Sequence, residues 1–401
     1  MKIFSSLEIR NFKLYWIGTV LSSIGTWIQM VAQSWLIFQL TNSEFLLGFI
    51  GFLSSIPILV FSLPSGVIAD KKDKRYILIF TQSALMILSF ILGFLTSSGS
   101  IKVWHIMIIV LFTGSIMALD GPARQSFVLE LVGSEKLTNA IGLNSAAFNA
   151  ARVIGPAIAG VIIGSMGAAV CFYINGISFI AVIAALLAMK KTKIFQNYKS
   201  QNQNIWDNLK QGFNYLFSNK KVLLLIVLVG IQSLIVMPYA TFMPVFAESV
   251  FHKGAKGLGI LMSSAGFGAL LGALYVATFS SKSARNEKII IQSYGILSVS
   301  LILFAISKIY YLSIVFLVFI GWATITSIGN INSLLQINVP DELRGRIMSM
   351  FMLAFAGIIP FGSLLAGSIS SILNVQFTFA FFGLLCLLVT VWLHFKGREF
   401  L

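Results

Sequence analysis

The sequence predicts an all-α integral membrane protein with twelve transmembrane helices in two pseudosymmetric six-helix bundles. Of its 401 residues, 57% are hydrophobic and 10% are charged, whereas about a quarter of the residues in a soluble domain are charged. Apolar runs of the roughly 20 residues that a helix needs to cross a bilayer recur along the chain. Lys and Arg are concentrated in every second loop between these runs. A soluble domain of useful size has no room in the remainder.

Six apolar runs come before the middle of the chain and six follow it. The first six span residues 14–39, 46–68, 76–97, 102–123, 139–165 and 168–189, and the second six span 221–247, 257–279, 288–306, 311–336, 347–372 and 375–395. The first run is too long for a signal-peptide core, so we expect it to be retained as a span. The chain then divides into an N-terminal bundle over 1–189, a cytoplasmic linker over 190–220 and a C-terminal bundle over 221–401.

The linker contains a segment with helical periodicity. Its apolar residues recur at helical spacing and are Trp206, Leu209, Phe213 and Leu216. The polar residues between them are Asp207, Lys210 and Asn214. Such a helix can lie flat on the cytoplasmic membrane surface. An ordinary connecting helix explains the same pattern.

Lys and Arg gather in alternate loops, and this pattern sets the expected orientation. Cytoplasmic loops hold the excess of basic residues. One set of loops holds most of them, including Lys71 to Arg75, the lysines of the linker and Arg344 with Arg346. Both termini are therefore expected in the cytoplasm of a bacterial inner-membrane protein. The net charge of +15 then reflects insertion, and a nucleic-acid partner is disfavoured because the charges form no single basic face.

A weak internal repeat relates the two halves. The segment from Gly155 to Gly160 in the fifth span has a counterpart from Gly362 to Gly367 in the eleventh. Cys171 and Cys386 occupy comparable places in spans six and twelve, where a packing role is expected. Two repeated halves place a solute cavity at their interface near mid-membrane.

The loop after the second span reads Gly66-Val67-Ile68-Ala69-Asp70-Lys71-Lys72-Asp73-Lys74-Arg75. It resembles the G-x-x-x-D-(R/K)-x-G-(R/K)-(R/K) loop of the major facilitator superfamily, with Asp73 in place of the second glycine. The resemblance implies that Asp70 and Arg75 belong to a latch that holds one conformation of the two halves. The alternative is a basic loop that only sets orientation.

The fourth span ends in Asp120-Gly121-Pro122-Ala123-Arg124-Gln125. Asp120 and Arg124 are one helical turn apart near the inner membrane face. They can form a simple interfacial ion pair, worth under about 1 kcal/mol if exposed. A second interpretation makes them part of a cytoplasmic gate that breaks and reforms.

Arg152, near the middle of the fifth span, is the most informative residue. A charge at that depth costs roughly 2.5–3.5 kcal/mol on insertion scales, so we expect it to face a cavity or a partner. A carboxylate or a substrate anion can supply that partner, and we favour a role in coupling or substrate binding. No Asp or Glu lies in the middle of a span, which disfavours export of a cation and favours an anionic or neutral substrate.

Small residues follow Arg152. Gly155, Pro156 and Gly160 resemble the glycine-proline motif in the fifth helix of major facilitator antiporters, and Gly362 and Gly367 repeat the glycine pattern near Pro360. We interpret them as helix contacts and a rocking hinge, although close packing alone would explain them.

Several amides in the spans are candidates for a substrate cavity. They are Gln29, Gln33, Asn144, Asn149, Gln232, Asn330, Asn332 and Gln336. Amides in lipid need partners, so each can equally join two helices.

Taken together, these motifs and the segment from Pro340 to Arg346 resemble the enterobactin-exporter-like branch of bacterial major facilitators. That resemblance implies proton-driven export of a siderophore, drug or similar amphiphile by alternating access. We expect a monomeric chain that needs no cofactor. A lysophospholipid or lipid transporter of the same fold is the alternative. A membrane enzyme is less favoured, because His105, His252 and His394 have no ligand partners nearby in sequence and no metal site is expected.

Overall fold

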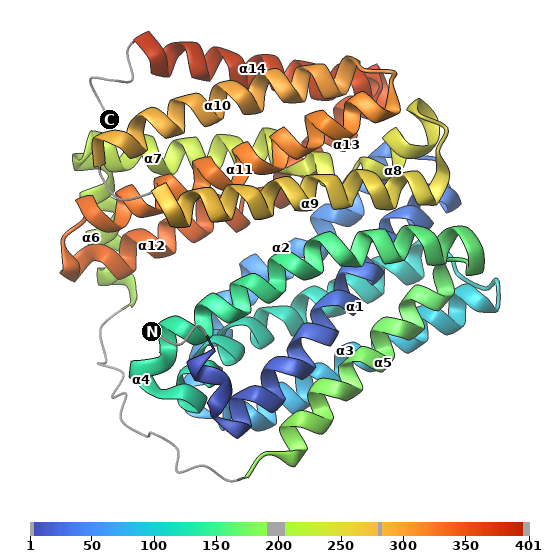
Figure 1. Cartoon of the computed structure of the whole chain (residues 1–401), viewed down its shortest axis with the longest axis horizontal. Coiled ribbons are helices and arrows are strands. Elements are labelled where there is room, and N and C mark those ends of the chain that lie inside the picture. Colours follow the sequence, from blue (N-terminus) through green and yellow to red (C-terminus); the bar gives the residue numbers. More distant parts are fainter. Residues whose placement is uncertain (1–3, 191–204, 280–282, 396–401) are drawn as a thin grey trace. The chain divides into compact units, whose positions relative to one another are not determined.

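In a computed structural model, the chain is helical throughout the residues that the structure describes, which are 4–190, 205–279 and 283–395 (Figure 1). Side chains are outside this description at 62, 63, 67, 69–71, 205–210 and 283–285. Of the predicted linker, residues 191–204 therefore lie outside it.

The helices follow one another in the order expected from the apolar runs. They are η1 (Ser5–Glu8), α1 (Arg10–Thr41), α2 (Glu44–Lys71), α3 (Lys74–Ser97), α4 (Val103–Met166), α5 (Ala168–Ala188), α6 (Ile205–Ser218), α7 (Lys220–Ile231), η2 (Gln232–Val236), η3 (Met237–Ala240), α8 (Met243–Val245), η4 (Phe246–Val250), α9 (Gly254–Phe279), α10 (Ser283–Ile306), α11 (Tyr310–Asn338), α12 (Asp341–Ala356), α13 (Ile359–Leu373) and α14 (Val375–Phe395).

Ten helical stretches within the described residues are long and apolar enough to cross a membrane. The 64-residue α4 carries both the fourth and the fifth predicted spans. Gly133 separates them, because its φ of 70° and ψ of 173° lie outside the helical region and favour glycine. The first predicted span, α1, is 32 residues long but is not among the ten. The predicted all-α membrane fold is confirmed.

The chain divides into two compact units. Unit 1 comprises Met1–Asn197 and His252–Ser263, and unit 2 comprises Tyr198–Phe251 and Ser264–Leu401. In unit 1, α1 packs against α4 and α5, α3 packs against the same two helices, and α2 packs along α4 (Figure 1). In unit 2, α10 packs against α11 and α14, α13 against α14, and α12 against α7.

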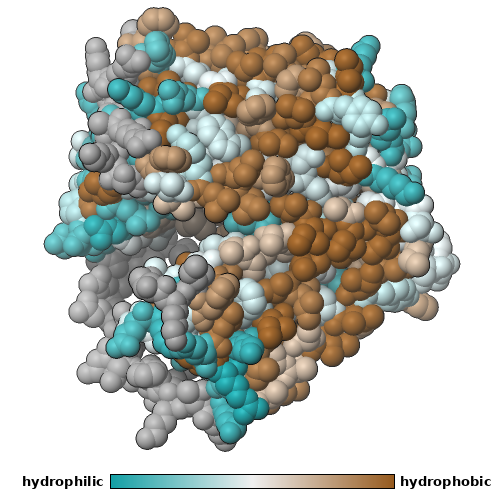
Figure 2. All heavy atoms as spheres, viewed as in Figure 1, coloured by the Kyte–Doolittle hydropathy of each residue, from teal (hydrophilic) through white to brown (hydrophobic). Residues whose placement is uncertain are grey.

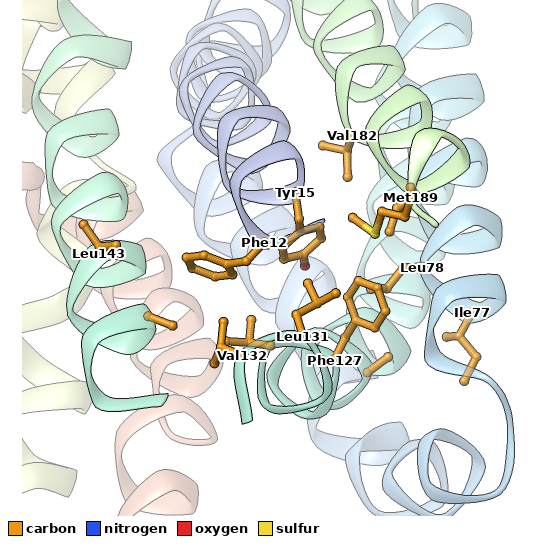
Figure 3. Close-up of a cluster of buried hydrophobic side chains, with 14 residues drawn as sticks. Phe12, Tyr15, Ile77, Leu78, Phe127, Leu131, Val132, Leu143, Val182 and Met189 are labelled. Carbon is orange, nitrogen blue, oxygen red and sulfur yellow. The ribbon is translucent and has the colours of Figure 1, made fainter. Parts of the chain in front are cut away.

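A cluster of buried apolar side chains joins the helices of unit 1 near the start of α1 (Figure 3). Phe12 and Tyr15 of α1 lie beside Phe127, Leu131 and Val132 of α4 in this cluster. Helices α3 and α5 also contribute to it. Each fully buried aromatic or aliphatic side chain stabilises the packed state by about 1.5–3 kcal/mol where water would otherwise reach it.

The seventh predicted span is interrupted in the structure, which the pattern of apolar residues did not predict. After α7 the chain passes through a π-helical turn, η2, and a 3₁₀ turn, η3. Pro238 has no N–H to bond to the carbonyl of Leu234, four residues earlier, so a regular α-helix cannot continue there. The eleventh span is likewise divided into α12 and α13, just before Pro360.

The predicted linker helix is present as α6, and it packs against α12 and α7 of unit 2. Arg346 of α12 donates to Gln211 over 2.5 Å, and Leu216 is buried. Phe213 and Phe217 are exposed and stack on each other. The side chains of Trp206, Asp207, Leu209 and Lys210 lie outside the described residues, so the surface-helix interpretation stays a prediction.

The surface of the helices is strongly apolar. On the face shown in Figure 2, hydrophobic residues cover the middle of the helices, and hydrophilic residues gather near their ends. Large apolar side chains such as Phe94, Val161 and Ile372 are well exposed. Such extensive exposed apolar surface marks contact with lipid rather than water.

Helices α9 and α11 approach closely in unit 2 because glycines line their contact. A Cβ at Gly321 would collide with the carbonyl oxygen of Ala265 and lie 2.9 Å from the amide nitrogen of Ala269. Both neighbours are backbone atoms, so the clash cannot be relieved by rotating a side chain.

We therefore expect Gly321→Ala to lower the free energy of unfolding by about 1–3 kcal/mol, through overpacking. Thermal unfolding of the purified protein in detergent measures this as a lower Tm. Gly142→Ala is the matched control, because a Cβ there meets no atom within 4 Å. Equal Tm values for the two variants would contradict the proposed close contact.

Candidate functional site

Arg152 lies midway along the second segment of α4, after the break at Gly133. Its side chain is half-buried, and its guanidinium carbon is 5.9 Å from the centre of the Trp27 ring of α1. This is the distance of a cation–π interaction. Among the described residues, no carboxylate pairs with Arg152 and no side chain or backbone group forms a hydrogen bond with it. The guanidinium therefore keeps its hydrogen-bond donors available.

Trp27 is held in place from the α4 side. The ring of Phe148, one turn before Arg152, meets the Trp27 ring edge-on with centroids 5.8 Å apart. A Cβ at Gly155 would lie 2.5 Å from the Cβ of Trp27. The absence of a side chain at Gly155 thus allows α1 and α4 to approach until Trp27 reaches both Phe148 and Arg152.

The other three predicted cavity amides of unit 1 lie on α4 and α1. Asn144 shares a helix face with Phe148 and Arg152, and its buried carbonyl oxygen has no hydrogen-bond partner among the described residues. Asn149 donates to the carbonyl of Ser145 over 2.8 Å. Gln33 of α1 is half-buried. A cation, two aromatic rings and an amide can together bind an anion that carries an apolar body.

Gln29 has a different environment. Its carbonyl oxygen accepts hydrogen bonds of 2.8 Å from Ser89 of α3 and from Asn175 of α5. The amide thus ties three helices together. Of its two predicted roles, joining helices is the one that these contacts favour.

Gln232 and Asn330 of unit 2 are fully buried. Gln232, at the start of the π-helical turn, donates to the Thr324 carbonyl over 3.2 Å and accepts from Ser327 over 2.9 Å. Asn330 donates to the Thr326 carbonyl over 2.8 Å. Gln232 thus connects η2 to α11, whereas the Asn330 bond lies within α11.

Asn332 and Gln336 lie one turn apart on α11. The Gln336 amide donates to Asn332 over 2.5 Å, and Gln336 is exposed. No described contact links them to another helix.

Asp120 is the centre of a buried polar network in unit 1. One carboxylate oxygen accepts from Thr81 over 2.7 Å and from Gln82 over 2.8 Å, both on α3. The other accepts from Nε and Nη2 of Arg124 over 3.0 and 2.9 Å. Asp120 is 2% exposed, whereas the Arg124 side chain is 29% exposed. The carboxylate of the pair is therefore buried and bonded to α3, whereas the guanidinium reaches solvent.

One aromatic side chain of α1 lies beside this network. Tyr15 lies close to Asp120 and Arg124, and its ring meets the Phe127 ring edge-on at 5.4 Å (Figure 3). Excluding water strengthens the ion pair but raises the cost of leaving either member alone. The arrangement is a firmly paired charge, in contrast to Arg152.

The loop between α2 and α3 is described only in part. Asp73 caps α3 by accepting from the Arg75 backbone N–H over 2.9 Å, which explains an acidic residue at this position. The Arg75 guanidinium donates to the Leu187 carbonyl at the end of α5 over 3.1 Å. The side chain of Asp70 lies outside the described residues, so its latch role stays a prediction.

The predicted packing glycines lie at close helix contacts. A Cβ at Gly160 would lie 2.8 Å from the carbonyl oxygen of Ala255, in the part of α9 that belongs to unit 1, and Pro156 beside it is buried. A Cβ at Gly362 would collide with the carbonyl oxygen of Leu234, and Gly367 is buried in α13. These contacts support the packing role, and the hinge role stays a prediction.

Thr81, Gln82 and Phe148 belong to these networks but were not predicted from the sequence. Polar Thr81 and Gln82 stand next to each other within an apolar run, which is a usable signal, but nothing local connects them with Asp120. No three His, Cys, Asp or Glu side chains in the described parts of the chain come together to hold a metal ion.

The helical membrane fold is that of a transporter family, and the chain belongs to the major facilitator superfamily. Residues 1–398 match the family described as transmembrane secretion effector. The protein is thus a multi-pass membrane transporter of small molecules and not an enzyme.

Similar proteins come from several bacteria. The chain is 28% identical to the staphyloferrin A transporter of Staphylococcus aureus, with 96% of each chain covered. It is 21% identical to macrolide efflux protein A of Streptococcus pyogenes, over 95% of this chain and 94% of the relative.

A solved structure of the same fold is that of a bacterial homologue of the lysosomal transporter Spinster. It has a TM-score of 0.75 at 12% identity, over 98% of this chain and 97% of that one. The nucleoside transporter NupG has a TM-score of 0.70 at 17% identity, with 98% of each chain covered.

The Asp120 network leads to a stability prediction. Asp120→Leu leaves Arg124 unpaired and is expected to lower the free energy of unfolding by about 2–4 kcal/mol, less than for a fully buried pair because Arg124 reaches solvent. Adding Arg124→Leu should recover much of this loss, because no buried charge then remains. A double-mutant cycle from denaturant unfolding in detergent measures the coupling.

Glu130→Gln, which breaks the half-buried pair with Lys74, is the control and should cost about 1 kcal/mol or less. If Asp120→Leu costs no more than this control, the network does not stabilise unit 1 as described.

Proposed function

We propose that this transporter exports an anionic or neutral amphipathic small molecule, such as a siderophore or a drug, by proton-coupled alternating access. The observation that supports it best is Arg152, a cation in the middle of a span whose only described contact is the Trp27 ring. A guanidinium in that position gains most from a ligand anion, because no carboxylate among the described residues competes for it. Trp27 and Phe148 provide the apolar surface for the rest of the substrate.

The relatives agree with this substrate class. The name of one relative refers to staphyloferrin A, and the name of another refers to macrolide efflux. A siderophore carries acidic groups that Arg152 can bind, whereas a macrolide is large and mostly apolar. We take the acidic substrate as the first candidate because of the unpaired guanidinium.

We assign gating to the charged groups at the predicted cytoplasmic ends of the helices. Asp120, Arg124, Asp70 and Arg75 hold one state of the two predicted six-helix bundles and exchange partners in the other. A proton gradient drives the exchange, and a single chain in the bacterial inner membrane is sufficient. Gly155, Pro156 and Gly160 form the pliable contact about which the helices move.

Arg152→Gln is expected to reduce transport of an acidic substrate strongly. A hydrogen bond to a charged group contributes about 1.5–3 kcal/mol, so affinity should fall by about 10- to 150-fold. Everted membrane vesicles with an imposed pH gradient measure accumulation of staphyloferrin A, a macrolide and a lysophospholipid. Arg152→Lys should retain part of the activity because it keeps the charge.

Lys308→Gln is the charge-matched control, because it removes one positive charge from an exposed outer loop. The proposal fails if Arg152→Gln and Lys308→Gln transport alike, or if accumulation does not depend on the gradient. Preferred accumulation of the lysophospholipid would instead support the lipid-transporter alternative.

The proposed orientation has a separate test. Green fluorescent protein fused after Leu401 should fluoresce, because it folds in the cytoplasm, and alkaline phosphatase fused at the same residue should be inactive. The same pair of reporters placed after Ser100, in a predicted outer loop, should give the opposite result. Active phosphatase at Leu401 would contradict the placement of the C-terminus.

A further inference from the structure

Helix α4 has an elbow at Gly133, between the two segments that carry the charged candidate residues. Gly133 is the only residue of α4, which the structure describes in full, with a non-helical φ and ψ. Asp120 and Arg124 lie before the elbow, and Arg152 lies after it. A Cβ at Gly133 would meet no atom within 4 Å, and glycine accepts many backbone angles. Contacts elsewhere must therefore fix the angle between the two segments.

The short helix η1 (Ser5–Glu8) makes such contacts just after the elbow. The backbone N–H of Ser6 donates to Oδ1 of Asn139 over 3.0 Å, and the Ser6 hydroxyl donates to the carbonyl of Lys136 over 3.0 Å. Ser6 is fully buried, and a buried polar group is costly unless it is hydrogen-bonded. The second segment of α4 provides both acceptors, so η1 is held on this segment.

Lys136 adds a second connection in the opposite direction. Its Nζ donates to the carbonyl of Ser5 over 3.2 Å and to a carboxylate oxygen of Glu8 over 3.3 Å. The Glu8 side chain is 53% exposed and that of Lys136 is 34% exposed, so water competes for this pair and it contributes little alone. Four hydrogen bonds between described residues thus join η1 to the stretch 136–139, and the exposed ones are easily broken.

Apolar packing extends the contact to the residues before the elbow. Leu7 of η1 packs against the buried cluster of unit 1. That cluster contains Leu131 and Val132 just before the elbow and Leu143 after it. Phe12, in the first turn of α1, lies among these side chains (Figure 3). Together, η1 and the start of α1 bridge the two segments of α4.

We propose that η1 is a strap that fixes the angle of the α4 elbow and thereby sets where Arg152 lies relative to Asp120. When the strap detaches, Gly133 serves as the hinge, because the backbone of α4 leaves the helical conformation only there. The strap acts through the elbow, since none of its four bonds to α4 involves Asp120 or Arg152. It lies wholly within unit 1 and does not depend on the proposed export activity.

Hydrogen–deuterium exchange of the full chain in nanodiscs tests the strap. Ser6→Ala combined with Lys136→Met removes three of the four bonds and keeps the aliphatic stem of Lys136. Amide exchange in η1 and in the stretch 131–140 should become about 10- to 100-fold faster, the factor expected for about two net hydrogen bonds. Exchange in α3 and α5 should stay unchanged, because the opening is local. Lys136→Arg keeps a cationic donor for Ser5 and Glu8 and should exchange like the unmodified chain.

Ser5→Ala combined with Glu130→Gln is the matched control. It also removes one serine hydroxyl and one ion pair, that of Glu130 with Lys74 just before the elbow. The four strap bonds stay intact, because Ser5 contributes only its backbone carbonyl to them. Exchange at 131–140 in this control should stay close to that of the unmodified chain.

A distance measurement tests whether the strap sets the angle of the elbow. Gln125 and Ala146 are exposed on the two sides of Gly133. Spin labels are attached to cysteines at these two positions, in a chain whose buried native cysteines, Cys171 and Cys386, are replaced by alanine. Double electron–electron resonance should give one narrow distance distribution for the strapped chain. The distribution should widen or gain a second distance when Ser6→Ala and Lys136→Met are added.

The proposal is overturned if exchange at 131–140 is no faster in the strap variant than in the matched control. Faster exchange with unchanged label distances also overturns it, because η1 then detaches without moving the elbow. If the double variant exchanges faster throughout unit 1, Lys136→Met alone decides, because it leaves Ser6 bonded. It should still speed exchange at 131–140 about two- to tenfold, and no change there refutes the strap. None of these measurements requires transport.

Discussion

The cost of placing polar groups in a lipid-surrounded helix bundle governs the rest of this structure. Lipid offers no hydrogen bonds, so each polar side chain must find a partner within the protein or remain at a cost. Asp120 meets this requirement completely, with four hydrogen bonds from three side chains. Gln29, Gln232 and Asn175 meet it by joining neighbouring helices. These polar residues are thus part of the scaffold.

Against that background, Arg152 stands out. Its contact with Trp27 contributes about 0.5–2 kcal/mol, which does not fully offset the roughly 2.5–3.5 kcal/mol of placing a guanidinium at this depth. The difference lowers the free energy of unfolding of unit 1. On the proposed function, an anionic substrate relieves it on binding, so substrate should also stabilise the folded transporter by mass action. The guanidinium, which pairs with no described carboxylate, then connects stability, substrate charge and transport.

Composition and periodicity were enough to predict the fold class, because the length of each apolar run is set by the bilayer and not by tertiary contacts. They did not predict the irregular turns around Pro238, because hydropathy does not register a missing N–H. Charges are rare in spans, so Asp120 and Arg152 could be singled out without knowledge of their neighbours. The Asp120–Arg124 pair could be predicted from its one-turn spacing, but the contacts of Asp120 with Thr81 and Gln82 could not, because those residues come from another helix. Burial cost is readable from a sequence, but partners on other helices are not.

The two units have diverged chemically although their sequences keep traces of a repeat. Gly155 and Gly362 occupy matching places, yet a Cβ at Gly155 would meet the side chain of Trp27 in α1, whereas a Cβ at Gly362 would meet the carbonyl of Leu234 in the irregular seventh span. The described polar interior of unit 1 contains charges, as in Asp120 and Arg152, whereas that of η2 and α11 contains amides and hydroxyls. A repeat that conserves small residues preserves how closely helices approach. It leaves the side chains around those contacts free to change, so the polar interior can be ionic in one unit and neutral in the other.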